Sequence, residues 1–284
     1  MKIISTINEY KSIYPKLAGP IGFVPTMGAL HLGHASLLKK ARTKCETLVL
    51  SIYLNPTQFG KNEDLGSYPK PLEKDLTLAK ELNVDIVFTP TTNQIYPNGF
   101  STWVEEKTLS KHLCGKFREG HFLGVTTVVL KLFQILKPHF AVFGLKDAQQ
   151  FFVLNKIVTD LNLDIKLFGS ETIRENNGLA LSSRNAYLSK DELQLGSKIY
   201  QSLQKIASQP NPLEEIQKQK KILTQIGFNV QYFEALTLPH FDQVQSHKTR
   251  SILIAIAAFL GKTRLIDNII LNKELLEKDQ IYFI

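Results

Sequence analysis

Five short apolar segments, alternating with segments of helical spacing, restrict this 284-residue chain to few folds. They are rich in β-branched and aromatic residues and span 20–25, 47–54, 84–88, 139–143 and 164–168. Between them, apolar residues recur every three to four positions, first at Leu72, Leu76, Ala79 and Leu82 and later at Leu154, Ile157, Val158 and Leu161. This alternation predicts an α/β fold with a Rossmann-like, doubly wound parallel sheet.

The pattern changes after about residue 172. Ser189 and Glu192 make a capping-box sequence that predicts a helix to about Ala207, and Q-P-N-P separates it from a second helix that ends at Gly227. Three strand-like segments follow: F-N-V-Q-Y-F-E-A-L, S-I-L-I-A-I-A-A-F and T-R-L-I-D-N-I-I-L. We therefore expect a larger domain over residues 1–172 and a smaller α+β domain over residues 173–284, with a peripheral tail from Asn272.

Composition argues against several classes of protein. No apolar run reaches the roughly 18 residues of a membrane span, and the N-terminus turns polar too early for a secretory signal. Cys45 and Cys114 lack the spacing of a disulfide framework or a structural zinc site, which favours a cytoplasmic protein. The net charge of +8 is compatible with nucleic acid or anionic small substrates as ligands, but a solvated basic surface is the favoured interpretation. Because the lysines are interleaved with acids, we expect neither nucleic acid nor a membrane as partner.

The stretch P-T-M-G-A-L-H-L-G-H follows the first predicted strand and leads into a helix from about Gly33. Unpaired N–H groups at a helix start attract anions. His31 and His34 can donate to phosphate oxygens there, and glycine allows close backbone approach. A zinc pair would more often stand four residues apart and needs further ligands. A phosphate cradle is favoured over zinc, and two locally hydrogen-bonded histidines remain the plain alternative.

Three other stretches place polar residues after predicted strands or at the domain junction. Asn55 and Gln58 lie in N-P-T-Q-F, Lys146, Asp147 and Gln150 lie in F-G-L-K-D-A-Q-Q, and Ser182, Ser183 and Arg184 lie in G-L-A-L-S-S-R-N. Each stretch alone could be a turn, a surface ion pair or a cap. Since ligands of parallel sheets bind beyond the carboxyl ends of the strands, their convergence on one edge predicts a single site.

These motifs, together with R-E-G-H-F-L-G-V-T-T-V-V-L-K-L-F and G-K-T-R-L-I-D-N, resemble the signatures of the pantothenate synthetase (pantoate–β-alanine ligase) family, in that family's order, to about Leu271. The H-x-G-H motif alone is shared by the wider nucleotidyl-transferase group. The resemblance implies an enzyme that joins pantoate to β-alanine using ATP and Mg²⁺, through a pantoyl-adenylate, with release of AMP and pyrophosphate. It also implies a homodimer built through the larger domain.

The resemblance further implies which residues form the site. The catalytic residues would be His31, His34, Lys146, Ser182, Ser183 and Arg184. ATP would contact these six together with Pro25, Thr26, Met27, Gly33, Gly144, Asp147, Ile173 and Leu181. Pantoate would contact Pro25, Met27, Gln58 and Gln150. No metal ligand is assigned, and Asp75 is only weakly similar to an acidic residue near the magnesium in some family members.

The chain departs from the family at three positions. Leu145 replaces the usual glutamate, Leu181 replaces methionine, and Asn177 replaces aspartate. The Leu181 change nearly conserves volume, whereas Leu145 removes a charge near the nucleotide. Two other functions compete with the ligase: a nucleotidyl transferase with a dinucleotide or CDP product, which has no reason to keep both Gln58 and Gln150, and a nucleic-acid-binding protein that exploits the basic charge.

Overall fold

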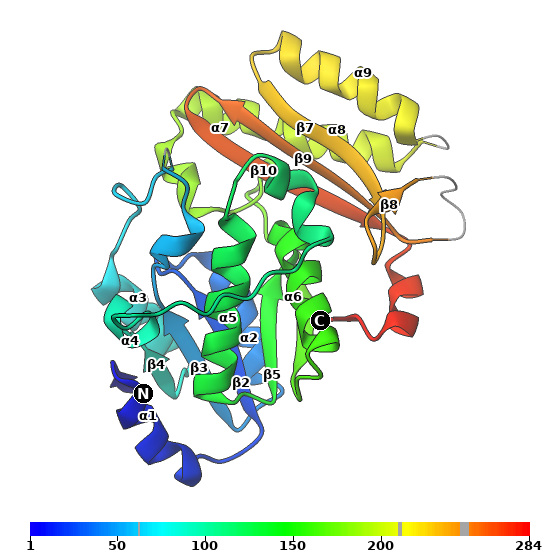
Figure 1. Ribbon diagram of the computed structural model, residues 1–284. Coiled ribbons are helices and arrows are strands. Elements are labelled where there is room, and N and C mark those ends of the chain that lie inside the picture. Colours follow the sequence, from blue (N-terminus) through cyan, green and yellow to red (C-terminus); the bar gives the residue numbers. More distant parts are fainter. Residues whose placement is uncertain (62, 210–211, 245–249) are drawn as a thin grey trace.

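The computed structural model describes residues 1–61, 63–209, 212–244 and 250–284, which form two sheets with their covering helices (Figure 1). The larger sheet is parallel and has the strand order β1-β4-β3-β2-β5-β6-β11. Its strands are β1 (Lys2–Ile4), β2 (Ile21–Thr26), β3 (Thr47–Ile52), β4 (Ile86–Phe88), β5 (Phe140–Gly144), β6 (Lys166–Ser170) and β11 (Tyr282–Phe283). The chain reverses direction across the sheet between β2 and β5, which confirms the doubly wound α/β prediction.

Helices cover both faces of this sheet. On one face, α1 (Ile7–Ile13), α5 (His121–Leu136) and α6 (Ala148–Asp160) bury their apolar sides with Phe23, Val49 and Phe143. On the other face, α2 (Leu32–Arg42) and α3 (Leu72–Glu81) pack with Val24, Leu48 and Leu50. Consecutive strand residues therefore enter opposite cores, which is why these strands are apolar throughout. A short helix, α4 (Thr92–Ile95), follows β4.

The smaller sheet is antiparallel, with the order β10-β9-β7-β8. Its strands are β7 (Asn229–Thr237), β8 (Asp242–Gln243), β9 (Ile252–Leu260) and β10 (Thr263–Leu271). One face packs against α8 (Lys198–Ala207) and α9 (Pro212–Gln225), while Tyr232, Leu253 and Ala257 on the other face join the core of the larger sheet. The two sheets thus share an apolar interface.

Two local expectations need correction or extension. The capping box at Ser189 and Glu192 is formed, but the helix it starts, α7 (Lys190–Gly196), ends at Ser197 before α8 begins, so one predicted helix is two. The tail expected to be peripheral buries Leu276 and Ile281 and adds β11 beside β6. Part of the Q-P-N-P segment, residues 210–211, lies outside the described residues.

Candidate active site

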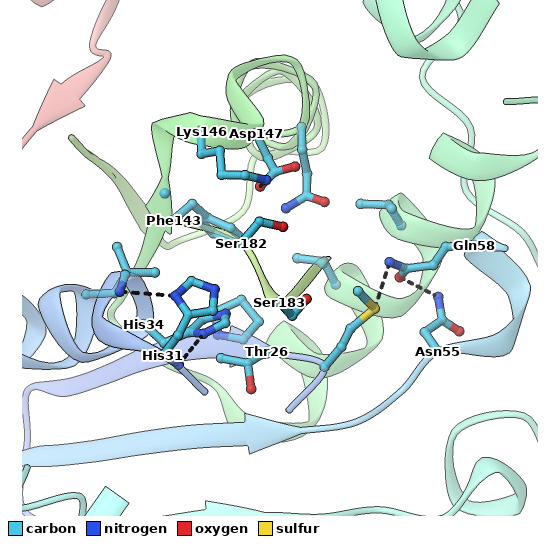
Figure 2. Close-up of a pocket in the computed structure, with 18 of the residues that line it drawn as sticks. Thr26, His31, His34, Asn55, Gln58, Phe143, Lys146, Asp147, Ser182 and Ser183 are labelled. Atoms are coloured by element: carbon cyan, nitrogen blue, oxygen red, sulfur yellow. Dashed lines mark hydrogen bonds and ion pairs between the residues drawn. The ribbon is translucent and has the colours of Figure 1, made fainter. Parts of the chain in front are cut away.

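A cavity of about 230 Å³ lies beyond the carboxyl ends of β2, β3, β5 and β6, at the point where the strand order reverses. We call it the site cavity. In Figure 2 the two histidines lie on one side of it, Asn55 and Gln58 lie on the other, and Lys146 and Asp147 descend from the turn after β5. Every residue predicted for ATP or pantoate lines it: Pro25, Thr26, Met27, His31, Gly33, His34, Gln58, Gly144, Lys146, Asp147, Gln150, Ile173, Leu181, Ser182, Ser183 and Arg184.

His31 and His34 cap α2 through their own ring nitrogens. His31 is the N-cap residue, and its Nδ1 accepts from the backbone N–H of Gly33 at 3.1 Å. Nδ1 of His34 accepts from the backbone N–H of His31 at 3.3 Å. A nitrogen that accepts carries no proton, so each neutral ring holds its proton on Nε2 as a donor. The local hydrogen bonds and the phosphate-cradle interpretation are therefore compatible.

Both imidazoles are neutral at neutral pH. Burial and the nearby positive charge of Lys146 lower the pKa of His31 to about 4. Burial, together with His31 and Lys146, lowers the pKa of His34 to about 3. The ring centroids are 4.2 Å apart, a separation at which two charged rings would repel each other strongly. The pair can thus offer two N–H donors without fixed charge.

The loop before His31 is held by Asp75, a residue without a predicted role in the site. Its buried carboxylate accepts from the backbone N–H of Ala29 at 2.8 Å and of Leu30 at 2.7 Å. Gly28 and Ala29 both have positive φ, at 84° and 51°, so this loop needs outside support. Asp75 therefore supports the loop that positions the histidines and does not itself line the site cavity.

Asn55, Gln58 and Met27 form the opposite wall. Nδ2 of Asn55 donates to Oε1 of Gln58 at 3.1 Å, and Nε2 of Gln58 donates to Sδ of Met27 at 3.1 Å. The hydroxyl of Tyr96 donates to Oδ1 of Asn55 at 3.0 Å. A glutamine with both ends engaged has a fixed orientation, and Figure 2 shows Asn55 and Gln58 together on the side of the site cavity opposite the histidines.

Lys146 stands on a 3-10 turn, Leu145–Asp147, directly after β5. Asn268 of β10 donates to the backbone carbonyls of Leu145 at 2.8 Å and Lys146 at 3.0 Å, so the smaller sheet anchors this turn. The side chain of Leu145 is 3% exposed and belongs to the larger core. The position at which the sequence resemblance predicts glutamate is thus apolar and buried in this protein.

The Ser182–Arg184 segment contacts the loop that follows Gln58. Oγ of Ser182 accepts from the backbone N–H of Arg184 at 3.2 Å, and Oγ of Ser183 lies 3.2 Å from the hydroxyl of Tyr68. Arg184 donates to both oxygens of Asp64, at 2.9 and 2.7 Å. In this bidentate pair, two N–H groups of the guanidinium donate in parallel to two oxygens. The same two groups would fit two oxygens of a phosphate equally well.

The presence of asparagine at position 177 is explained by its local hydrogen bonds. Its Nδ2 donates to the carbonyl of Leu193 at 3.0 Å while its Oδ1 accepts from the N–H of Leu179 at 3.1 Å. An aspartate could make only the second bond. The amide therefore suits its surroundings, and this departure lies in a turn outside the site cavity.

Several polar side chains at the site had no predicted role: Asp64, Tyr68, Asp75, Arg118, His121 and Asn268. Arg118 and His121 stand in the R-E-G-H stretch, so a motif signal existed, but nothing in the sequence indicates their partners. In the described part of the chain, no group of three or more His, Cys, Asp and Glu residues could hold a metal ion. Nor is any described helix long and apolar enough to cross a membrane.

Comparison with known proteins agrees with this geometry. The family model for pantoate-beta-alanine ligase matches residues 2–270. The pantothenate synthetase of Thermosipho africanus is 48% identical over 95% of this chain and 100% of its own. That of Thermotoga petrophila is 47% identical over 96% and 100%, respectively.

Solved structures are also similar. Pantothenate synthetase from Thermus thermophilus has a TM-score of 0.86 and 37% identity, covering 95% of this chain and 99% of that one. The pantoate-beta-alanine ligase of Francisella tularensis, complexed with beta-gamma ATP and beta-alanine, has a TM-score of 0.80 and 38% identity, covering 95% and 97%. The chain therefore belongs to the pantoate–β-alanine ligase family and is an enzyme that forms pantothenate from pantoate and β-alanine.

Proposed function

We propose that this enzyme activates pantoate by adenylation with ATP before β-alanine attacks. The observation that carries the proposal is the convergence of the sixteen predicted contact residues on the site cavity at the switch point of the sheet. The relative from Francisella tularensis, complexed with beta-gamma ATP and beta-alanine, supports ATP as the co-substrate.

We assign the triphosphate to His31, His34, Lys146, Ser182, Ser183 and Arg184. The Nε2 protons of the two neutral histidines and the hydroxyl groups of the serines donate hydrogen bonds, while Lys146 and Arg184 supply positive charge. Arg184 exchanges Asp64 for a phosphate when ATP binds. Adenine and ribose lie near Gly144, Asp147 and Ile173, with Pro25, Thr26, Met27, Gly33 and Leu181 completing the contact surface.

Pantoate lies between Pro25, Met27, Gln58 and Gln150. A neutral amide orients a carboxylate without strongly lowering its nucleophilicity, whereas an arginine fork would hold it and blunt it. The hydrogen bond from Gln58 to the weak acceptor Met27 Sδ, at 3.1 Å, is easily exchanged for one to a carboxylate oxygen.

The chemistry then needs alignment more than a protein nucleophile. A carboxylate oxygen of pantoate attacks the α-phosphorus, the bond to the β-phosphate oxygen breaks, and pyrophosphate leaves. Lys146, Arg184 and the histidines stabilise the charge that grows on the leaving group. The amine of β-alanine next attacks the acyl carbon and loses a proton, and AMP departs with one oxygen from pantoate.

Mg²⁺, a hard cation that binds through few protein carboxylates and substrate phosphates, fits a site without a protein metal cage in its described residues. We propose that the ATP phosphates would hold Mg²⁺ in the site cavity, where it would neutralise phosphate charge. We also propose a cytoplasmic homodimer formed through residues 1–172, where Trp103 is 44% exposed beside Tyr96 and Phe100. The part of residues 173–284 that precedes β11 would act as a smaller lid domain.

The deciding experiment is exchange of labelled pyrophosphate into ATP with pantoate present and β-alanine absent. Adenylation predicts that exchange requires pantoate and that AMP is the nucleotide product of the full reaction. With β-alanine alone, neither exchange nor AMP formation is expected. Gln58→Ala should weaken exchange and pantothenate synthesis in parallel. Formation of ADP and phosphate, or no exchange without β-alanine, would refute the adenylate route.

A further inference from the structure

The stretch Arg118–Gly124 resembles a family signature, yet the proposed chemistry gives it no task. His121 is the first residue of α5, and the N-cap Gly120 has a φ of 75° that turns the chain into the helix. Arg118, His121 and Gly124 are spaced three apart, and each makes a hydrogen bond with the segment Asn55–Gln58 after β3. This contact lies at the wall proposed to receive pantoate, where Arg118 and His121 also line the site cavity.

Both ring nitrogens of His121 are committed. Nε2 lies 2.8 Å from Nη1 of Arg118, and Nδ1 lies 2.9 Å from the backbone carbonyl oxygen of Gln58. Arginine can only donate and a carbonyl can only accept, so Nε2 is the acceptor and the single proton sits on Nδ1. Burial and Arg118 lower the pKa of His121 to about 4, which keeps this tautomer neutral. The ring has no nitrogen left for a substrate.

Arg118 is itself fixed. Its Nε and Nη2 donate to the two carboxylate oxygens of Glu63 at 2.6 and 2.7 Å. The side chains of Arg118 and Glu63 are only 16% and 24% exposed. Because a bidentate pair restrains the guanidinium plane, the proton acceptor of His121 faces a donor in a defined position.

Gly124 makes the third contact. Its carbonyl accepts from Nδ2 of Asn55 at 3.2 Å. A Cβ on Gly124 would lie 2.5 Å from the carbonyl oxygen of Thr57 and 2.7 Å from the backbone nitrogen of Gln58. Only glycine lets α5 approach the 3-10 helix Pro56–Gln58 this closely.

We propose that His121, braced by Arg118, is a positioning residue that fixes the backbone of Gln58 and thereby aims its side chain at the carboxylate of pantoate. The inference rests on the assignment of Gln58 to pantoate. His121 lines the site cavity beside Gln58, but both of its ring nitrogens are engaged, so its effect on the first half-reaction passes through Gln58.

Two amide replacements separate the two contacts of His121. In His121→Asn the amide nitrogen stands near the place of Nδ1 and keeps a donor for the Gln58 carbonyl. In His121→Gln the amide stands near the place of Nε2 and keeps an acceptor for Arg118 but loses that donor. In pyrophosphate exchange, we expect His121→Gln to raise the KM for pantoate by on the order of tenfold or more. His121→Asn should raise it several-fold less, with the KM for ATP within about twofold in both.

A double-mutant cycle tests whether the effect passes through Gln58. In a Gln58→Ala background, His121→Gln should change the KM for pantoate by less than about twofold. Arg118→Gln, which leaves His121 in place but removes both its brace and the 3.5 Å hydrogen bond from Arg118 to the Gln58 carbonyl, should also raise the KM for pantoate alone. Equal effects of the Asn and Gln variants, or the full effect persisting without the Gln58 side chain, would overturn the inference. Failure of the proposed function would appear differently, as absence of pantoate-dependent exchange in the unaltered enzyme.

Discussion

Gly124→Ala is expected to separate stability from activity, because the added methyl group meets backbone rather than a movable side chain. The new Cβ would lie 2.5 Å from the carbonyl oxygen of Thr57, 2.6 Å from its carbonyl carbon and 2.7 Å from the nitrogen of Gln58. Restoring a tolerable contact of 3.0 Å, or an ordinary one of 3.4 Å, requires a separation larger by roughly 0.5 to 0.9 Å. Either α5 or the segment carrying Gln58 must move.

The stability change should be small. Overpacking of this size costs about 1–3 kcal/mol, while replacing glycine inside a helix gains about 1 kcal/mol. The net loss in free energy of unfolding is therefore about 0–2 kcal/mol. A displacement of nearly 1 Å in a group that aligns a reacting carboxylate costs far more, on the order of ten- to a hundredfold in rate.

The assay pairs chemical unfolding with pantoate-dependent pyrophosphate exchange. Gly196→Ala is the matched control, since this buried glycine ends α7 and its Cβ would meet only side chains, the nearest being Leu179 at 3.2 Å. Gly196 does not line the site cavity, so exchange should stay within about twofold of the parent. A Gly124→Ala enzyme that is folded and exchanges at the parent rate would refute the reasoning.

Three further changes test other parts of the structure. Lys146→Ala should lower the rate of pyrophosphate release by on the order of a hundredfold with folding kept; near-normal turnover would remove Lys146 from the leaving-group site. Because the pKa of His121 falls from 6.5 to about 4 on folding, the unfolded chain binds the extra proton between these values. The free energy of unfolding should therefore decrease as the pH falls from about 6.5 towards 4. At about pH 5 the contribution of His121 to this decrease should be roughly 2 kcal/mol. Urea unfolding at about pH 7.5 and 5 measures this decrease. An equal decrease in the His121→Asn variant would contradict the assignment of the effect to His121. Arg174→Met should cost about 3–5 kcal/mol by stranding Asp267, which is 3% exposed and paired at 2.6 Å; a loss in unfolding free energy below about 1 kcal/mol would contradict this.

The long apolar strands could be predicted because each is buried on both faces. The segments 20–25, 47–54 and 139–143 correspond to β2, β3 and β5 within one or two residues. β1 and β11 were not predicted, since they have only three and two residues and owe their existence to neighbours far along the chain. The break between α7 and α8 was equally hidden, because the sequence around Ser197 contains no proline and its one glycine, Gly196, is also compatible with a helix.

The residues that line the candidate site could be predicted because they stand in motifs directly after strands or at the domain junction. The supporting layer could not. Asp75 supports the loop before His31 from α3, Asn268 reaches the Lys146 turn from β10, and His121 holds Gln58 from α5. Each contact joins residues between 45 and 123 positions apart, a range over which periodicity and capping rules carry no information.

The return of the chain to β11 changes how the smaller sheet is attached. The chain leaves the larger sheet at the end of β6 and re-enters it at Tyr282, paired with Phe168 of the same β6. The chain between β6 and β11 is in effect an insertion at one edge of the larger sheet, and its two covalent connections lie side by side. Nζ of Lys40 donates to the carbonyl oxygen of Ile284 at 2.7 Å. The covalent connections of the smaller sheet therefore both lie beside β6, so that one edge of the larger sheet determines where the smaller sheet is attached.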